Sequence, residues 1–432
     1  MKDKISIFWF RRDLRLNDNT GLFHSLNENS KVLPLFIYDT NIISKLKNND
    51  HRLHFINTSI NQMNHLLKKE NKFIYRLKGN PLDVFKNLLK NFNIEKVYTN
   101  RDYTPYAIKR DSKIKKLLND NKIEFNDYKD HVLFEKNEIT KDDGSPYKVY
   151  TPYSRKWISR MIEQGIDEYK SENLTKNLID LSIGLVSDTI NLPNNNINFL
   201  KVNTSSNLIN QYEFTRNFPS KDATSKVGVE LRFGTISTRK LIKKANESNN
   251  KTYLKELVWR EFFQQILYHF PKTITSSFKP LYDRIEWINN EGDFKKWCDG
   301  ETGYPLVDAG MRELNKTGFM HNRVRMLVGS FLCKHLLIDW RWGEAYFREK
   351  LFDYETASNV GNWQWVAGCG VDAAPYFRIF NPTEQLKKFD KELKYTKKWV
   401  PELYSDKYVE PIVEHKFARE RCLTTYKKAL GK

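Results

Sequence analysis

Cysteines and long apolar runs are both scarce in this sequence. The 432 residues include four cysteines, and no two of them form a Cys-x-x-Cys pair: Cys298, Cys333, Cys369 and Cys422. This spacing argues against a zinc site, an iron–sulfur cluster and a disulfide framework, so we expect no metal and a reducing, cytoplasmic setting. No apolar run approaches the roughly 20 residues that span a bilayer, and no signal peptide is visible. We therefore expect a soluble protein without membrane attachment.

The chain also lacks internal repeats, low-complexity domains and a G-x-G-x-x-G motif after its first strand-like run. Residues 1–130 nevertheless alternate short β-rich runs, such as 5–10 and 32–38, with amphipathic stretches such as 51–69. Alternation with short connections predicts an α/β domain with a five-stranded, Rossmann-like parallel sheet and helices on both faces. Without the glycine motif, a standard dinucleotide site in this domain is not expected.

After the α/β part the pattern changes twice. Residues 131–207 are irregular, with a turn at 142–145 and an Asn/Ser-rich stretch at 192–207, and we expect a connector that lies on the surface. Residues 208–432 contain helical patterns and no strand patterns, which predicts an all-helical domain. The formal net charge of +19 is compatible with a polyanionic partner, although lysine is abundant throughout the chain and could produce this charge without one.

Two expected helices carry side chains suited to a flat ligand. On helix 253–269, Tyr253, Glu256 and Arg260 share one face, with Trp259 beside Glu256. This group could stack on a base and bond to its edge. A Glu–Arg ion pair on a solvated face is the alternative.

Helix 322–338 has two distinct faces. Its apolar face predicts a core contact and consists of Val324, Leu327, Val328, Phe331 and Leu332. Its other face could hold a ligand and consists of Asn322, Arg325, Met326 and Gly329. Arg325 needs a carboxylate if it is buried, and Asp353 is the nearest candidate. Arg323 points about 100° away from Asn322 and could reach a phosphate.

The stretch 353–380 is rich in glycine and aromatic residues. Trp363 and Trp365 stand between glycines, and Tyr376, Phe377 and Arg378 follow in a row. Such a stretch is typical of a pocket wall for a flat cofactor with a lip that faces nucleic acid; a packed helical core is the alternative.

A shorter segment, Thr224-Ser225-Lys226-Val227-Gly228, combines hydroxyls, backbone donors and a lysine before a helical pattern. It could cradle a diphosphate, or Ser225 and its neighbours could simply cap the helix.

Several long motifs in order resemble the photolyase/cryptochrome family, most closely the class I cyclobutane pyrimidine dimer photolyases. They are FWFRRDLRLNDN, TSKVGVELRFGTIS, ELVWREFF, TGYPLVDAGMRELNKTGFMHNRVRM, LLIDWRWGEAYF and GNWQWVAGCGVDAAPYFRIFNP. The resemblance implies a helical C-terminal domain that binds FAD and a deoxyribodipyrimidine photo-lyase that repairs UV-damaged DNA with blue light. It also implies a monomer with no obligatory protein partner. A cryptochrome-type photoreceptor and a (6-4) photoproduct photolyase are the alternatives within the family.

The resemblance assigns cofactor contacts to particular positions. Tyr212 and the segment Thr224, Ser225, Lys226, Val227 and Gly228 match contacts to the FAD diphosphate and ribose. Positions around the isoalloxazine and the adenine are matched by Tyr253, Arg260, Asn322, Arg325, Asp353 and Glu355. Tyr253 stands where relatives often have Trp, and Glu355 where many have Asp. Asn359 falls at the position that faces flavin N5.

It likewise assigns substrate contacts and an electron path. Glu256, Trp259, Asn322 and Met326 match the dimer pocket. DNA-facing positions are matched by Arg216, Arg323, Trp365 and Arg378. Trp363, Trp340 and Trp287 match a chain of tryptophans that leads from the flavin to the surface. Without the resemblance, core packing would be the simpler interpretation of these three.

A second, antenna chromophore is implied in the N-terminal domain. Folate-binding relatives have Asn-Glu where this chain has Tyr106-Ala107, which argues against methenyltetrahydrofolate. Arg52 and Asp102 are compatible with a deazaflavin or with another flavin-type antenna, and the sequence does not distinguish between these two chromophores.

Overall fold

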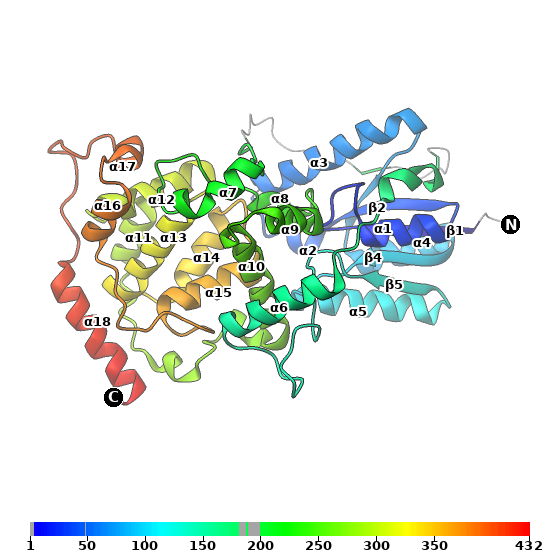
Figure 1. Ribbon diagram of the computed structural model, residues 1–432. Coiled ribbons are helices and arrows are strands. Elements are labelled where there is room, and N and C mark those ends of the chain that lie inside the picture. The colour runs from blue at the N-terminus through cyan, green and yellow to red at the C-terminus, as the bar shows by residue number, and fades with distance from the viewer. Residues whose placement is uncertain (1–3, 48, 181–186, 189–198) are drawn as a thin grey trace. The chain divides into compact units, whose positions relative to one another are not determined.

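The β-branched and aromatic runs near the start of the chain pair into one parallel sheet in the computed structural model (Figure 1). The strands are β1 (Lys4–Phe10), β2 (Val32–Asp39), β3 (Tyr75–Gly79), β4 (Asn93–Asn100) and β5 (Glu124–Tyr128). Their order in the sheet is β3-β2-β1-β4-β5, and Ile7 of β1 lies opposite Leu33 and Val97. The predicted five-stranded parallel sheet is confirmed.

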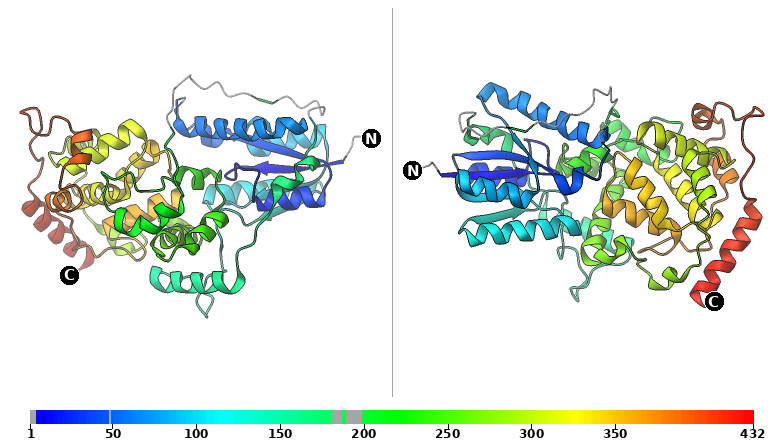
Figure 2. Two further views of the ribbon diagram at one scale, coloured as in Figure 1. Left: turned by 45° about the horizontal axis from the view of Figure 1, so that its top comes forward. Right: turned by 180° about the vertical axis from the view of Figure 1, so that it is seen from behind.

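The side chains of β1 alternate between two helical layers because successive residues of a strand point to opposite faces. Ile7 and Trp9 pack in an apolar cluster with α4 (Pro81–Asn91) and α5 (Pro105–Asp120). Phe8 points the other way, towards Gly21 of α1 (Thr20–Glu28). Helices thus cover both faces of the sheet, as predicted (Figure 2).

The packing divides the chain into two compact units. The first comprises residues 1–138, 157–202 and 226–247, and the second comprises residues 139–156, 203–225 and 248–432. The structure describes residues 4–47, 49–180, 187–188 and 199–432. Residues 181–186 and 189–198 of the predicted connector, including part of its Asn/Ser-rich stretch, lie outside the described residues. The division of the chain at residues 130 and 207 stays a prediction.

The remaining elements of the first unit are helices around the sheet. They are α2 (Thr40–Ile43), α3 (His51–Leu67), η1 (Lys68–Glu70), η2 (Ser171–Asn177), α8 (Gly228–Phe233), α9 (Thr238–Glu247) and the second half of α6 (Tyr150–Gln164). Buried charges connect α9 to the sheet domain: Asp130 accepts from Arg15 at 2.7 Å and from Arg239 at 2.9 Å. Residues 226–247 therefore belong to the first unit although they follow the last strand of its sheet by almost a hundred positions.

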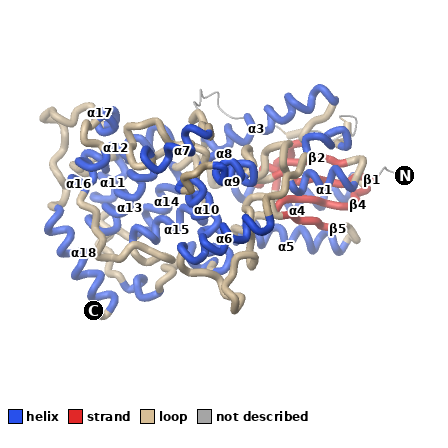
Figure 3. The backbone as a smooth tube through the Cα atoms, viewed as in Figure 1, coloured by secondary structure: helices blue, strands red, loops and turns tan. Residues whose placement is uncertain are grey.

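The second unit is helical, and all strands of the sheet (red in Figure 3) belong to the first. Its helices are α7 (Ser206–Thr215), α10 (Thr252–His269), η4 (Pro271–Ile274), η5 (Pro280–Arg284), α11 (Glu291–Asp299), α12 (Pro305–Thr317), α13 (Asn322–Ser330), the π-helical turn η6 (Phe331–His335), α14 (Trp340–Lys350), α15 (Thr356–Ala367), α16 (Pro382–Phe389), α17 (Lys394–Trp399) and α18 (His415–Leu430). Among the described residues, no helix is both long enough and apolar enough to cross a membrane.

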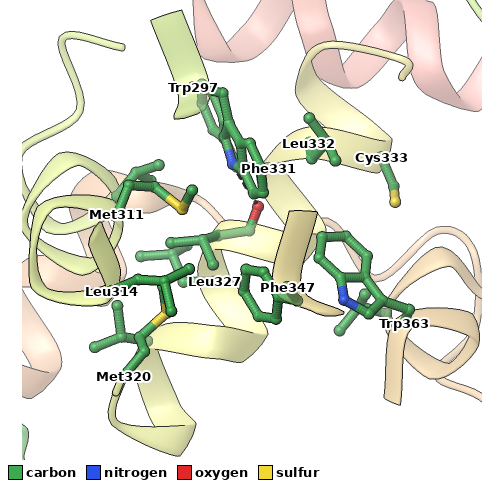
Figure 4. Close-up of a cluster of buried hydrophobic side chains, with 14 of the residues drawn as sticks. Trp297, Met311, Leu314, Met320, Leu327, Phe331, Leu332, Cys333, Phe347 and Trp363 are labelled. Atoms are coloured by element: carbon green, nitrogen blue, oxygen red, sulfur yellow. Dashed lines mark hydrogen bonds between the residues drawn. The ribbon is translucent and has the colours of Figure 1, made fainter. Parts of the chain in front are cut away.

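The core of the helical unit is built around aromatic side chains from α11, α14 and α15 (Figure 4). Trp363 of α15 lies edge-on to Phe347 with ring centroids 5.0 Å apart. The helices approach closely because glycine stands at the contacts. A Cβ added to Gly343 would come within 2.1 Å of Trp363, and one added to Gly361 within 2.3 Å of Phe263.

Two expectations for this unit need correction. The helix predicted over 322–338 is α-helical only to Ser330 and then widens into η6. The stretch 353–380 contains a helix in its first half, because residues 356–367 form α15, which Glu355 caps at its start and Gly368 ends with a φ of 87°, and turns and loops follow. Several helices were not predicted at all: α1, α6 and α15–α18. Helix α15 is buried on most sides, polar residues such as Asn359 and Gln364 included, so it lacks the simple one-sided apolar pattern that marks a surface helix.

Candidate functional site

A pocket opens in the helical unit between α13, α14 and α15. Its empty volume is about 590 Å³, a figure that includes open solvent at the mouth of the pocket. The lining residues are Asn322, Arg325, Met326, Gly329, Phe347, Leu351, Asp353, Tyr354, Glu355, Ser358, Asn359, Asn362, Trp363 and Val366. The pocket therefore combines amides and charges with apolar side chains.

One wall of the pocket is the predicted ligand face of α13. Asn322, Arg325, Met326 and Gly329 all line it. The opposite face of the same helix is buried in the core, as expected from Val324 and its apolar neighbours. Helical spacing in the sequence thus predicted both faces of this element correctly.

The facing wall is α15, and sequence reasoning found only part of it. Trp363 and Asn359 were assigned, whereas Ser358, Asn362 and Val366 were missed. Together with Glu355 these residues recur every three or four positions, so they share one side of a helix. That period was a usable signal, but the glycines and tryptophans of the stretch suggested a loop instead.

A partly buried ion pair fixes the rim between the two walls. The Arg325 guanidinium donates to both oxygens of Asp353, from Nη1 at 3.2 Å and from Nη2 at 2.9 Å. Its Nε donates to the carbonyl oxygen of Met320 at 2.7 Å. The predicted partnership of Arg325 with Asp353 is confirmed, and the fork geometry holds both side chains in place.

Asn359 presents a defined atom to the pocket. Its Nδ2 donates to the backbone oxygen of Glu344 at 3.2 Å and to Glu344 Oε1 at 3.1 Å. The amide nitrogen is therefore used inside the protein, and Oδ1 is the atom that can accept a hydrogen bond from a ligand. Glu344 is 2 % exposed and pairs with Arg348. Sequence reasoning did not assign Glu344 a role.

The donors and acceptors of the pocket suit a flat heteroaromatic ring with polar edges. The amide of Asn322 can donate or accept, whereas Asn359 and Asn362, whose Nδ2 atoms donate to Glu344 and Ser358, chiefly offer their oxygens. Met326 and Trp363 supply apolar contact. An isoalloxazine has N–H and carbonyl groups along one edge and an apolar body, so the residues present fit the flavin part of FAD. Among the described residues, no group of His, Cys, Asp and Glu is arranged to bind a metal ion.

Other predicted cofactor residues lie outside the pocket lining. Tyr212 and Tyr253 meet edge-to-face with ring centroids 5.1 Å apart, and burial raises the pKa of both hydroxyls. Arg260 lies on α10. Thr224 and Ser225 belong to the helical unit, whereas Lys226, Val227 and Gly228 belong to the first unit. Their contacts to a diphosphate stay a prediction.

Glu256 makes an ion pair, but its partner comes from another helix. The Arg216 guanidinium, at the end of α7, donates to Glu256 Oε1 at 2.5 Å. The carboxylate keeps 35 % of its side chain exposed. The structure thus brings together a predicted dimer contact and a predicted DNA contact in one ion pair between two helices.

Trp259 also has a partner that the sequence did not indicate. Its indole stacks on the Tyr150 ring with centroids 3.7 Å apart and planes 6° from parallel. Tyr150 begins α6, in a stretch that was expected to be connector.

The tryptophans of the predicted electron path lie in one aromatic core. Trp363 and Trp340 are 3 % and 1 % exposed and belong to the same apolar cluster. Trp287 is partly buried, packs against that cluster and meets Tyr426 edge-on at 6.0 Å. Trp297 lies 6.2 Å from Trp363, so it is a further aromatic neighbour of the pocket. This burial is compatible with core packing and with an electron path, the two interpretations of Trp363, Trp340 and Trp287.

The remaining predicted DNA contacts are distributed over the surface of the helical unit. The guanidinium of Arg323 lies 4.5 Å from the Phe389 ring centroid and donates to Asn217 Oδ1 at 2.5 Å. The carbonyl oxygen of Arg378 accepts from the buried Lys334 at 2.8 Å. Trp365 is partly buried against the core.

His321 yields a test of this part of the structure. Its Nδ1 accepts from the Arg323 N–H at 3.2 Å and caps α13. Burial, helped by Arg325, Arg323 and Arg216, lowers its pKa from 6.5 to about 4. Below pH 6.5, His321 therefore binds a proton in the unfolded chain but stays neutral in the folded protein. The free energy of unfolding consequently decreases as the pH falls towards 4.

We expect the unfolding free energy to decrease by about 2 kcal/mol more in the wild type than in His321→Asn between pH 7 and pH 5. Asparagine is a good N-cap, so the variant keeps the helix start. Urea denaturation at the two pH values measures the difference. An equal decrease in both proteins would contradict a neutral, buried His321.

The predicted antenna residues of the first unit are occupied by contacts within the protein. Arg52 pairs with Asp50 at 2.5 Å, and Asp102 pairs with Arg12 at 3.4 Å. The Tyr106 hydroxyl donates to Asp39 Oδ2 at 2.5 Å, and burial together with Asp39 raises its pKa to about 12. These contacts do not identify a chromophore.

Family models match both units of the chain. Residues 6–170 match the model described as DNA photolyase. Residues 253–406 match the model described as FAD binding domain of DNA photolyase. The second match includes the whole pocket. The predicted FAD-binding character of the helical domain is thereby confirmed.

Individual proteins are similar over nearly the full length. The deoxyribodipyrimidine photo-lyase of Agrobacterium fabrum is 34 % identical, with 97 % of each chain covered. A crystal structure of a bacterial class III photolyase from Agrobacterium tumefaciens has a TM-score of 0.86 and 31 % identity, covering 100 % of this chain and 99 % of its own. A cryptochrome from Synechocystis has a TM-score of 0.86 and 25 % identity, covering 98 % and 99 %.

Proposed function

Because the chain belongs to the DNA photolyase family, we propose that it is a deoxyribodipyrimidine photo-lyase, which binds FAD and splits cyclobutane pyrimidine dimers in DNA with light. The observation that carries the proposal is the pocket of the FAD-binding domain, where Asn322, Arg325, Asp353, Asn359 and Trp363 converge. When bound and reduced, FAD excited by light supplies the electron that opens the cyclobutane ring and receives it back afterwards.

The pocket residues would hold the ring system and set its surroundings. Asn359 Oδ1 would accept from an N–H at the inner edge of the ring, since Glu344 holds its Nδ2. The Arg325–Asp353 pair would place a donor and an acceptor next to the ring without adding net charge. Apolar contact from Met326 would exclude water near the reacting bonds.

Substrate binding would use the outer part of α10. Trp259 would stack on the flipped pyrimidines, and Glu256 would accept from their imide N–H groups. The guanidinium of Arg216 holds that carboxylate in place. Arg216, Arg323 and Arg378 would also contact phosphates of the DNA. Such contacts fix the register of the DNA without reading its sequence.

For the lesion, we propose the cyclobutane dimer rather than the (6-4) photoproduct. Enzymes of the second type have a catalytic histidine near the pocket, and the α13 face offers Asn322 and Met326 instead. The nearby His321 is engaged as a helix cap and 4 % exposed. Class I is the class that the motifs favour, whereas one similar solved structure is a class III enzyme.

We also propose an antenna other than methenyltetrahydrofolate, which extraction and mass spectrometry of the bound chromophores would test.

The deciding experiment is a repair assay on defined substrates. The FAD-loaded, chemically reduced protein is incubated with an oligonucleotide that carries a single cyclobutane dimer, in blue light and in the dark. We expect restored thymines only in the light. A duplex with a (6-4) photoproduct serves as the second arm, and repair there alone would reassign the lesion. If the protein repairs neither substrate and does not bind dimer-containing DNA more tightly than undamaged DNA, a photoreceptor function would be favoured.

A further inference from the structure

We propose that Tyr150 is a positioning residue of the lesion pocket: it covers one face of the Trp259 indole and so directs a flipped base to the opposite face. The inference rests on the proposed function, because it concerns the ring on which a base would stack. The motifs that carry the family resemblance do not include Tyr150, which lies more than a hundred residues before Trp259.

The contact itself is close and parallel. The rings lie 3.7 Å apart at the centroids with 6° between their planes, whereas aromatic pairs in proteins commonly lie about 4.5–7 Å apart. A third ring cannot enter this stack without separating it. A base therefore either displaces Tyr150 or uses the other face of the indole.

Several anchors favour the second possibility. The Tyr150 N–H donates to Asp372 Oδ2 at 3.1 Å, and the hydroxyl donates to the carbonyl oxygen of Lys255 at 2.7 Å. Tyr153, one turn later, is fully buried and packs on Phe262 at 5.1 Å. Rotating the Tyr150 ring away from the indole would break the hydroxyl bond to Lys255, and moving the backbone as well would break the bond to Asp372 and disturb this packed turn of α6.

The phenol also belongs to the electrostatic surroundings of the pocket. Burial raises the pKa of Tyr150, Glu256 raises it further, and Arg216 opposes this effect. The hydroxyl therefore stays protonated and keeps its bond to Lys255, the residue that precedes Glu256. One side chain thus fixes the plane of Trp259 and the backbone beside Glu256.

The test is a binding titration with dimer-containing and undamaged oligonucleotides of the same sequence. We expect Tyr150→Ala to bind the dimer about three- to tenfold more weakly, the value of one aromatic pair. Tyr150→Phe keeps the ring and should restore most of the affinity. In a Trp259→Ala background, Tyr150→Ala should cause no additional loss, because the two rings act as one unit.

Ile162→Ala is the matched control, since this side chain lies on the same helix and is 69 % exposed. Equal FAD absorbance and equal melting temperature exclude a folding defect. Unchanged or tighter binding by Tyr150→Ala would overturn the proposal, and tighter binding would identify Tyr150 as a placeholder that the base displaces. The proposal would also be overturned if Tyr150→Ala weakened dimer binding as much in the Trp259→Ala background as in the wild type. A wild type that does not prefer dimer DNA would instead refute the proposed function, and this inference with it.

Discussion

Replacing Trp363 with phenylalanine should abolish light-driven reduction of the bound flavin while repair by the chemically reduced enzyme survives. Trp363 lines the pocket and is the proposed entry from the aromatic core, with Trp340 and Trp287 behind it. Phenylalanine keeps the apolar contact with Phe347 and Gly343 but is much harder to oxidise than an indole. The measurement is the loss of the oxidised-flavin absorption band under blue light with an external reductant.

A matched control is needed because Trp363→Phe also removes buried volume. Trp399→Phe makes the same chemical change at a tryptophan that packs against the same core cluster but does not line the pocket. We expect photoreduction in this variant to proceed as in the wild type. Photoreduction that persists in Trp363→Phe would show that the electron enters by another route, for which Tyr354 of the pocket lining and Trp297, 6.2 Å from Trp363, are candidates.

Replacing Trp259 with alanine should weaken binding of dimer-containing DNA by about 1–3 kcal/mol, which is the usual value of stacking one base on an aromatic side chain. At constant temperature this corresponds to a dissociation constant roughly five- to 150-fold higher. FAD content should not change, because Trp259 does not line the cofactor pocket. Fluorescence anisotropy with labelled oligonucleotides measures the effect.

Binding of undamaged DNA is the internal reference for this variant. Phosphate contacts from Arg216, Arg323 and Arg378 would persist, so weak, salt-dependent binding should be retained. Tyr404→Ala removes an aromatic side chain that is 76 % exposed and outside the proposed site, and it should bind like the wild type. Loss of FAD from Trp259→Ala would mean that the indole supports the fold of α10 rather than a base.

The sequence determined the parts of the structure that depend on local periodicity. Buried β-rich runs alternate with helical runs, so the parallel sheet and its helical layers followed from the pattern. The two faces of α13 also followed, since residues three and four apart meet on one side of a helix. A buried guanidinium needs a carboxylate, and the motif offered Asp353 as the nearest one, which the structure pairs with the partly buried Arg325.

Helix α15 shows where local pattern was insufficient. Its glycines and tryptophans look like loop residues until their partners are known. Gly361 accommodates the Phe263 ring of α10, which is distant in sequence, and Gly343 of the preceding helix α14 accommodates Trp363, so both fits depend on how separate helices pack. The polar stripe of Ser358 and Asn362 was present in the sequence but was obscured by this composition.

Only the tertiary structure decided which side chains share a contact across distant segments. Arg216 meets Glu256, Glu344 orients Asn359, and Tyr150 stacks on Trp259. No periodicity relates these positions, because each pair joins different helices whose packing is set by the apolar core. The sequence by itself therefore determined the layers of the fold, the family and most walls of the pocket, whereas packing alone decided how those walls are held and which face of Trp259 is covered.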